Sequence, residues 1–429
     1  MKLWQKKGST TSSLVEQFTI GRDKEFDIEL AKYDVIGSMA HCRMLHKVGL
    51  LKKQELTLIL KALQEIKLEI ENKKFKIEKG IEDIHSQVEK LVTERYGEVG
   101  KKIHTGRSRN DQIALDSKLY YRDQITQTKE HANTLFKVFI GLAKKHQRDL
   151  LPGYTHYQLA MPSSFGLWFS AYAESLIDDV LALNLAYQIC DRNPLGSGAG
   201  YGSSFPLDRM ETTKLLGFSE ANINSIYAQM GRTKAEKYIA FAISSLASTL
   251  AKFAMDCCLY INQNFQFISF PDHLTTGSSL MPHKKNPDVF ELIRAKCNRL
   301  QSIPNEINLL TTNLASGYHR DVQLLKEIIF PAFKEINSCI ELTLHMLEQI
   351  QIRKNILNDP QYKLLFTVDA LNEEVKKGTP FREAYQKIGN EVNEGTFDYK
   401  ANTVSHTHLG SIGNLGLNEL SLRMKGVMK

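Results

Sequence analysis

The sequence of 429 residues predicts an all-α protein organised around a bundle of long helices. Four long runs contain neither Gly nor Pro, namely residues 107–140, 167–193, 232–270 and 332–359. At a rise of 1.5 Å per residue, each run is long enough for a helix of about 40 Å or more. Sustained apolar–polar alternation and Asn-Gly or Asp-Gly turns are lacking, so strand signals are weak. Helices longer than the globular average are typical of bundles.

Apolar periodicity supports helices in the N-terminal and central parts. In residues 54–70 the apolar positions fall on one helical face: Leu56, Ile59, Leu60, Leu63, Ile66 and Ile70. In residues 235–259 apolar positions recur every three or four residues, and the opposite side is rich in Ala and Ser. We therefore predict a three-domain, all-helical architecture with a central long-helix bundle. The domains are an N-terminal helical domain over residues 1–107, a central long-helix bundle over residues 108–355 and a C-terminal helical domain over residues 356–429.

Composition and charge narrow the function classes. The chain is 42% hydrophobic and 24% charged, which is ordinary for a globular protein. Its formal net charge is +7, but the Lys residues are scattered among Glu along helical segments, as on a solvated surface. We therefore expect no nucleic-acid partner, because such proteins gather basic residues on one face. A mild positive balance suits an enzyme that attracts a small polyanion.

Apolar segments and cysteines indicate a cytoplasmic protein without a membrane span. The most apolar region, residues 238–255, is interrupted by Ser, Thr and Lys and is interpreted as a buried helix. The first eight residues are basic but are not followed by the apolar segment of a signal peptide. The six cysteines form no C-x-x-C pair, which favours structural thiols in a reducing compartment over a zinc site.

The first polar segment with possible chemistry is residues 104–112, H-T-G-R-S-R-N-D-Q, which opens a long helical run. Ser108 with Asp111 three residues later resembles a capping box. Arg109 and Asn110 would then lie in the first helical turn, where free N–H groups and an arginine make a good carboxylate site. The alternative is a plain helix cap with solvated arginines.

Two further segments are ambiguous on their own. Residues 151–158, closed by Pro162, are interpreted as a loop that carries Thr155 and His156, and a histidine in such a loop is more often structural than catalytic. Residues 316–326 restart a helix after Gly317, with polar side chains at its beginning. Taken alone, that pattern is more typical of an ordinary helix start than of a functional site.

The segment with the most specific pattern is residues 275–288, T-T-G-S-S-L-M-P-H-K-K-N-P-D. Its Gly, Ser pair and two Pro indicate a mobile loop, and its hydroxyl and ammonium groups could close over an anion. Asn286, Pro287 and Asp288 are interpreted as the N-cap, the first residue and an early acid of a new helix, with Glu291 one turn further in. The alternative is a Lys-rich surface turn.

Taken together, these motifs resemble a known family. G-S-S-L-M-P-H-K-K-N-P at residues 277–287 is similar to the signature loop of the aspartase/fumarase superfamily, and residues 104–112 resemble the argininosuccinate lyases within it. The similarity extends through D-I-H at residues 83–85, G-Y-T-H at 153–156, N-P-L-G-S-G-A-G at 193–200 and G-T-P-F-R-E-A at 378–384. It thus spans nearly the whole chain, with the motifs in family order.

The resemblance implies an aspartase/fumarase-like fold for the three predicted domains, and with it a reaction and an assembly. It implies reversible β-elimination of argininosuccinate to arginine and fumarate in arginine biosynthesis, through a carbanion and without a metal or organic cofactor. It also implies a homotetramer in which each active site draws on three subunits. By position, Ser278 matches the catalytic base, His156 the histidine associated with proton transfer, Glu291 its carboxylate partner, and Lys284 a loop residue that stabilises substrate charge.

The resemblance also implies which residues bind the substrate. Arg109 and Asn110 match residues that hold the succinyl carboxylates, with Ser108 beside them. Thr155 matches a neighbouring substrate contact, and Asn286, like Lys284, matches a loop residue that binds the substrate and stabilises its charge. By their five-then-three spacing, three further residues match those that recognise the arginine portion: Tyr318, Gln323 and Lys326.

The chain departs from the family in places. Many members carry a Ser shortly before the acidic pair that matches Asp27 and Asp34, whereas this chain reads I-G-R-D-K at residues 20–24. This departure puts the substrate contact expected there in doubt. Two other functions are alternatives: a sister lyase that acts on adenylosuccinate or aspartate, and a structural protein that keeps the fold without turnover. The first would replace residues 107–112, and the second would lose Ser278, His156 or Lys284.

Overall fold

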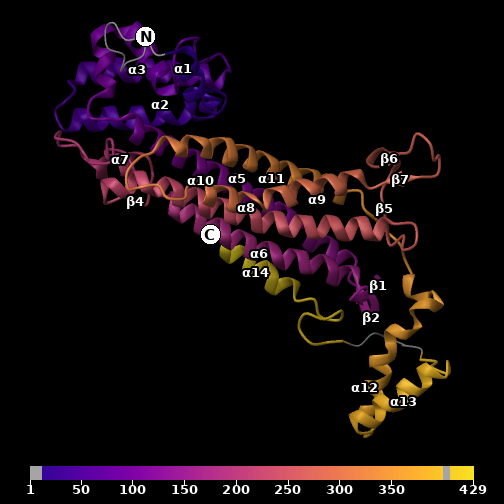
Figure 1. Ribbon diagram of the computed structural model, residues 1–429. Coiled ribbons are helices and arrows are strands. Elements are labelled where there is room, and N and C mark those ends of the chain that lie inside the picture. Colours follow the sequence, from indigo (N-terminus) through magenta and orange to yellow (C-terminus); the bar gives the residue numbers. More distant parts are fainter. Residues whose placement is uncertain (1–11, 400–405) are drawn as a thin grey trace. The chain divides into compact units, whose positions relative to one another are not determined.

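The computed structural model describes residues 12–399 and 406–429, and its regular structure is overwhelmingly helical (Figure 1). The predicted all-α class is therefore confirmed. The first eight residues, taken above as lacking a signal peptide, lie outside the described part. The chain divides into two compact units that are described separately. Unit 1 holds the described residues up to 128 with 182–245 and 300–336, and unit 2 holds 129–181, 246–299 and the described residues from 337 onward.

Unit 1 begins with four helices and a 3-10 helix: α1 (Ser13–Ile20), α2 (Asp23–Lys47), α3 (Lys53–Glu71), α4 (Ile84–Tyr96) and η1 (Gly97–His104). It also contains short elements, β3 (Arg192–Asn193), α7 (Arg209–Leu215), β4 (Glu220–Ala221), α10 (Ile303–Leu310) and η3 (Arg320–Leu324). The first halves of α5 (Arg109–Lys145), α8 (Ser225–Ile261) and α11 (Leu325–Leu347) and the last residues of α6 (Phe165–Cys190) complete it.

The apolar face predicted for residues 54–70 forms part of the core of unit 1. Ile59, Leu63 and Ile66 of α3 are fully buried, in one cluster with residues of α2, α4 and η1. A second group of contacts joins α5 to α11, where the rings of Tyr120 and Phe330 stack with centroids 4.1 Å apart. These contacts fix the start of α5, which carries candidate site residues.

Unit 2 contains the remaining halves of the long helices and several short pairings. Its strands are β1 (Leu150–Thr155), β2 (Gln158–Ser164), β5 (Ile268–Ser269), β6 (Thr276–Gly277), β7 (Lys285–Asn286) and β8 (Gln351–Ile352). Its other elements are η2 (Asp272–Leu274), α9 (Asp288–Leu300), η4 (Ile356–Asn358), η5 (Pro360–Phe366), α12 (Thr367–Lys376), α13 (Phe381–Asn393) and α14 (Leu417–Val427). Phe139, Trp168 and Phe253 pack as an aromatic core between α5, α6 and α8, with centroids of the first and last 5.0 Å apart.

Residues 151–158 are not a loop, and that prediction is wrong. They belong to an antiparallel hairpin in which Tyr154 pairs with Leu159 and Thr155 with Gln158. The two turn residues, His156 and Tyr157, have φ of 54° and 60°, as a type I′ hairpin turn requires. Pro152 faces Pro162 in register, so neither strand resembles an ordinary strand in sequence.

The predicted long helices are present, with shifted ends. Gly141 lies inside α5, Gly231 inside α8 and Pro331 inside α11, so these residues do not end the helices as predicted. α9 begins at Asp288, and Asn286, predicted as its N-cap, pairs instead in β7. By length and composition α8 could cross a membrane, but 61% of its most apolar window is buried within the protein, as expected for a core helix.

Candidate functional site

A polar cavity of about 260 Å³ lies within unit 1. It is lined from five parts of the chain: the α1–α2 junction, the start of α4, the start of α5, α8 and residues 318–326. The lining residues are Ile20, Asp23, Asp27, Glu82, Asp83, His85, Arg109, Asn110, Ile113, Arg232, Tyr318, Arg320, Gln323 and Lys326. The structure thus brings together five of the predicted binding residues, which are Arg109, Asn110, Tyr318, Gln323 and Lys326.

The start of α5 is held as the sequence predicts. The backbone N–H of Ser108 donates to the Asp111 carboxylate at 2.8 Å, and the Ser108 hydroxyl accepts from the N–H of Asn110 at 3.3 Å. Asp111 also accepts from the N–H groups of Gly196 and Gly198, each at 3.0 Å. Burial raises the pKa of Asp111 to about 6, against the opposing effect of these N–H groups. This buried carboxylate fixes the turn that presents Arg109 and Asn110.

Arg109 is engaged by acids at the mouth of the cavity. Its guanidinium contacts the carboxylate of Asp83 and the hydroxyl of Ser86, and it lies 3.5 Å from Glu82. Asp83 in turn caps α4 by accepting from the N–H of Ser86 at 2.8 Å. The arginine is therefore oriented before any substrate binds, and a substrate carboxylate would share it with these acids.

The ammonium group of Lys326 is buried in the cavity wall between two carboxylates. Its ammonium lies 2.5 Å from one oxygen each of Asp23 and Asp27, and its side chain is only 3% exposed. Burial and the charge of Asp27 raise the pKa of Asp23 to about 6, although Lys326 opposes the shift. The two carboxylates thus share one buried ammonium.

The other two residues predicted to recognise the arginine portion are also fixed. The amide of Gln323 donates to the carbonyls of Thr19 and Ile20 at 3.2 and 3.3 Å. The ring of Tyr318 faces the guanidinium of Arg232, 5.9 Å from its centroid. Because Arg232 is 3% exposed, its charge lies in the wall of the cavity.

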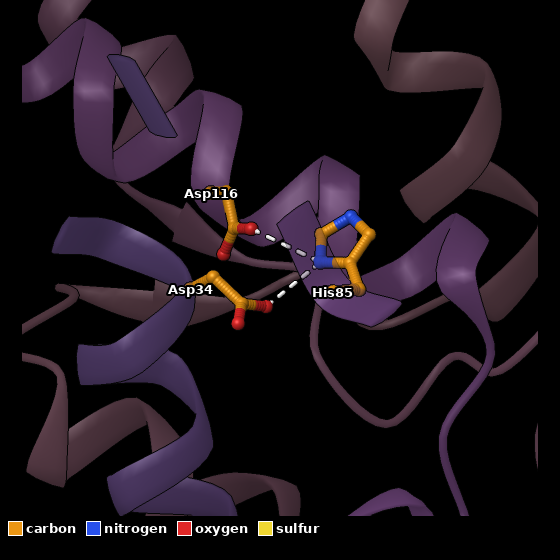
Figure 2. A group of neighbouring side chains, drawn as sticks. All are labelled: Asp34, His85 and Asp116. Carbon is orange, nitrogen blue, oxygen red and sulfur yellow. Dashed lines mark hydrogen bonds and ion pairs between the residues drawn. The ribbon is translucent and has the colours of Figure 1, made fainter. Parts of the chain in front are cut away.

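At the wall of the cavity, to which His85 contributes, lies a group of three buried side chains, Asp34, His85 and Asp116 (Figure 2). The Nδ1 atom of His85 lies 2.7 Å from Asp34 and 3.6 Å from Asp116. The ligand atoms of the three lie within 4.8 Å of one another, so the spacing alone would also admit a metal ion. The short contact between Nδ1 and Asp34 is that of a charge-assisted hydrogen bond, and we interpret the group as an ion pair.

Sequence reasoning had not assigned several cavity residues. Arg232 lies among other polar and charged residues before the apolar stretch at 238–255, so the sequence carries no signal for it, and Arg320 lies inside the segment at residues 316–326. Asp23 lies in the stretch that departs from the family pattern. It is about three hundred residues from Lys326 in sequence, so the sequence alone could not predict their contact. Asp27 and His85 had been quoted only as parts of motifs.

The remaining predicted residues belong to unit 2. Thr155 and His156 lie at the exposed tip of the β1–β2 hairpin. A positive φ at a residue other than Gly is uncommon and is often found at functional sites. A largely aromatic cavity of about 540 Å³ lies beneath this hairpin, and His156 contributes to its wall.

Ser278 begins the tip of a second hairpin, whose strands β6 and β7 pair Gly277 with Lys285. Its hydroxyl oxygen accepts from the backbone N–H of Met281 at 3.0 Å and of Leu280 at 3.3 Å. Lys284 is exposed, and Asn286 donates its amide to the carbonyl of Gly277 at 3.4 Å. Glu291 is exposed in the first turn of α9.

Comparisons with known proteins place the chain in a class. The model of a family described as Lyase matches residues 5–302. A solved EDDS lyase variant with bound fumarate shares the fold, with a TM-score of 0.74 and 20% identity over 98% of this chain and 90% of that one. The chain is thus a member of the lyase family.

Two relatives narrow the assignment. The argininosuccinate lyase of Bacteroides fragilis is 53% identical over 424 residues, which cover 99% of this chain and 94% of that protein. That of Parabacteroides distasonis is 53% identical over 100% of this chain and 95% of that protein. Within the lyases, the chain belongs to the argininosuccinate lyase family, as the motifs predicted.

Proposed function

We propose that this protein catalyses the reversible β-elimination of argininosuccinate to arginine and fumarate. The observation that carries the proposal is the unit 1 cavity, in which four carboxylates and four Arg or Lys side chains line one small space. Argininosuccinate has carboxylates together with an ammonium and a guanidinium group, so a lining with both signs of charge suits it. Membership of the argininosuccinate lyase family supports the same substrate.

Ser278 is proposed as the base that removes the proton next to a substrate carboxylate. A serine hydroxyl is a weak base unless its deprotonated form is stabilised. The two backbone N–H groups that point at its oxygen supply such stabilisation, because hydrogen bonds to an anion favour the anionic form. Lys284 and Asn286 are proposed to stabilise the dianionic intermediate.

The other roles are proposed from the positions of the residues in the family motifs. Arg109 and Asn110, at the helix start fixed by Ser108, are proposed to hold the succinyl carboxylates, with Thr155 as a neighbouring contact. Tyr318, Gln323 and Lys326 are proposed to bind the arginine portion. His156 is proposed to take part in proton transfer with Glu291 as its partner, since an imidazole can both donate and accept a proton.

A homotetramer with active sites shared between subunits is proposed as the working assembly. Exposed large apolar side chains along α8 support it: Met230, Tyr238, Phe241 and Met255. Such a row on one helix is typical of a subunit interface. Light scattering on the protein and on Phe241→Glu tests this; a monomeric wild type would contradict it.

We also propose a cytoplasmic role in arginine biosynthesis. All six cysteines are free, and five of them are buried, which suits a reducing compartment. Complementation of an arginine-requiring host that lacks argininosuccinate cleavage is the direct test, and failure of a well-expressed wild-type chain to restore growth would count against it.

A panel of substrates tests the reaction itself. The purified protein is incubated separately with argininosuccinate, adenylosuccinate and aspartate, and fumarate is followed by its ultraviolet absorbance. We expect fumarate from argininosuccinate only. Release from adenylosuccinate or aspartate would favour a sister lyase, and no release from any of them would favour a structural protein on this fold.

A further inference from the structure

His85 is a buried residue in the wall of the unit 1 cavity. It lies in the first turn of α4 and contributes to the cavity wall, yet its side chain is only 6% exposed. Figure 2 shows its Nδ1 directed at Asp34 of α2 and Asp116 of α5, and its other ring nitrogen, Nε2, on the side away from both carboxylates.

We propose that His85 is a substrate-binding imidazolium, whose Nδ1–H is held by Asp34 with Asp116 behind it and whose Nε2–H donates to a carboxylate of the substrate. The inference rests on the proposed function, because it takes the unit 1 cavity as the place where the substrate binds. It adds one binding residue, His85, and two positioning residues, Asp34 and Asp116.

The geometry fixes which edge of the ring is available. A contact of 2.7 Å between Nδ1 and Asp34 is a full hydrogen bond, and the backbone of α4 and the carboxylates of α2 and α5 leave the ring no freedom to turn. Among the described residues, neither Oδ2 of Asp34 nor Oδ2 of Asp116 accepts a hydrogen bond. Buried carboxylate oxygens without donors are costly, so a nearby positive charge is needed to compensate them.

The carboxylates around the ring favour its charged form. Burial alone would lower the pKa of His85, but Asp34, Asp116 and Asp83 outweigh it and raise the pKa to about 9. The other charged groups nearby are Asp27 on α2, His104 at the end of η1, and Arg107 and Arg109 beside the start of α5. Burial and the charge of Asp34 raise the pKa of Asp116 well above its usual value.

The charge of the cavity then decides which substrate group His85 faces. Four carboxylates and four Arg or Lys side chains line the cavity, so a charged His85 gives the cations a majority of one. Argininosuccinate has a net negative charge, and a positive N–H at the wall pairs with its carboxylates and not with its ammonium or guanidinium groups.

A proton explains the three side chains better than a metal ion does. A metal-bound histidine presents a nitrogen lone pair to the ion and needs space for the ion between its ligands. Here the lone-pair position of Nδ1 is occupied by the hydrogen bond to Asp34. The metal alternative becomes one outcome of the test.

The first experiment measures the charge of His85 directly. Histidine carrying a carbon-13 label at Cε1 is incorporated into the full chain, and the pH titration of each ring is followed by NMR, with His85→Gln for assignment. His41 is the internal control: it is fully buried, Nε2 bonds the Thr105 carbonyl, and burial with the charge of Arg107 lowers its pKa well below the usual value. We expect His85 charged and His41 neutral at pH 7.5, and a shift of the His85 signal when fumarate is added.

The second experiment measures the consequence for catalysis. In His85→Gln we expect KM for argininosuccinate to rise about tenfold or more, as for a lost charge-assisted hydrogen bond, with a smaller change in kcat. In both the wild type and Asp34→Asn, KM should rise with pH as His85 loses its proton. Because Asn cannot stabilise the imidazolium as Asp34 does, this rise should begin at a lower pH in the variant. A merely structural role for Asp34 would not shift the pH at which KM rises.

Distinct results would overturn the proposal. A neutral His85 at pH 7.5, a His85 signal that moves with added Zn²⁺ but not with fumarate, or an unchanged KM in a folded His85→Gln would each refute it. If the wild type cleaves no argininosuccinate, the proposed function fails instead. In that case, a charged His85 whose signal still shifts with fumarate would support its role in carboxylate binding, although the proposed function had failed.

Discussion

Replacing Lys326 by Met tests the electrostatics of the cavity wall. The lysine ammonium lies 2.5 Å from both Asp23 and Asp27, and Asp27 is 1% exposed. The variant keeps an apolar side chain of similar length but leaves the two carboxylates without their shared cation. Removing one partner of a buried ion pair costs about 3–5 kcal/mol, because the other charge stays buried and uncompensated.

The same geometry predicts how the cost depends on pH. Asp23 already has a pKa of about 6 beside Lys326, and loss of the ammonium would raise it further. At pH 5 the Asp23 carboxylate of the variant is therefore protonated, and the loss of stability should fall to about half of that at pH 7.5. A second substitution, Asp27→Asn in the Lys326→Met background, should recover about 2 kcal/mol at pH 7.5.

Urea unfolding followed by circular dichroism, at one fixed protein concentration, measures these differences. Lys334→Met on the same helix is the matched control. Its ammonium pairs with Glu29 at 2.6 Å, but the side chain is 61% exposed, so its removal should cost less than about 1 kcal/mol. Equal losses in the two variants, or a Lys326→Met loss that does not depend on pH, would refute the reasoning.

Three further predictions concern the stability that residues around the candidate sites contribute. Asp111→Ala removes the acceptor of three backbone N–H groups and should lower the free energy of unfolding by about 3 kcal/mol; a loss below about 1 kcal/mol in urea unfolding would contradict this. Tyr157→Gly relieves a positive φ at an exposed side chain, and thermal unfolding should show a gain of about 1 kcal/mol instead of a loss. For His85, whose pKa is raised to about 9 from 6.5, the contribution to stability is complete below about pH 6.5 and is lost as the pH rises through 9. It amounts to about 3 kcal/mol, and a pH series of urea unfolding should show this decline in the wild type but not in His85→Gln.

The fold could be predicted from the sequence where local signals are strong. Long stretches without Gly or Pro and with apolar periodicity became the long helices, because helix formation there needs no distant partner. The ends shifted because Gly141, Gly231 and Pro331 are tolerated inside helices that pack against neighbours. The β1–β2 hairpin was missed because its strands contain Pro and Gly and its turn residues are His156 and Tyr157, which do not favour the required conformation.

The candidate site could be predicted only in part. Arg109, Asn110, Tyr318, Gln323 and Lys326 came from motifs, and the structure places them around one cavity. Asp23 and Arg232 come from segments far apart in sequence, and only tertiary packing brings them beside those residues. Likewise, no spacing rule relates His85 to Asp34 and Asp116, because three different helices supply these side chains.

The most direct test of the account is the release of fumarate from argininosuccinate by the wild type, by Ser278→Ala and by Ser279→Ala, which removes the neighbouring hydroxyl. The account predicts rapid release by the wild type, a loss of about a thousandfold or more in kcat for Ser278→Ala, and a far smaller loss for Ser279→Ala. Full turnover in a folded Ser278→Ala, or no release by the wild type, would contradict it.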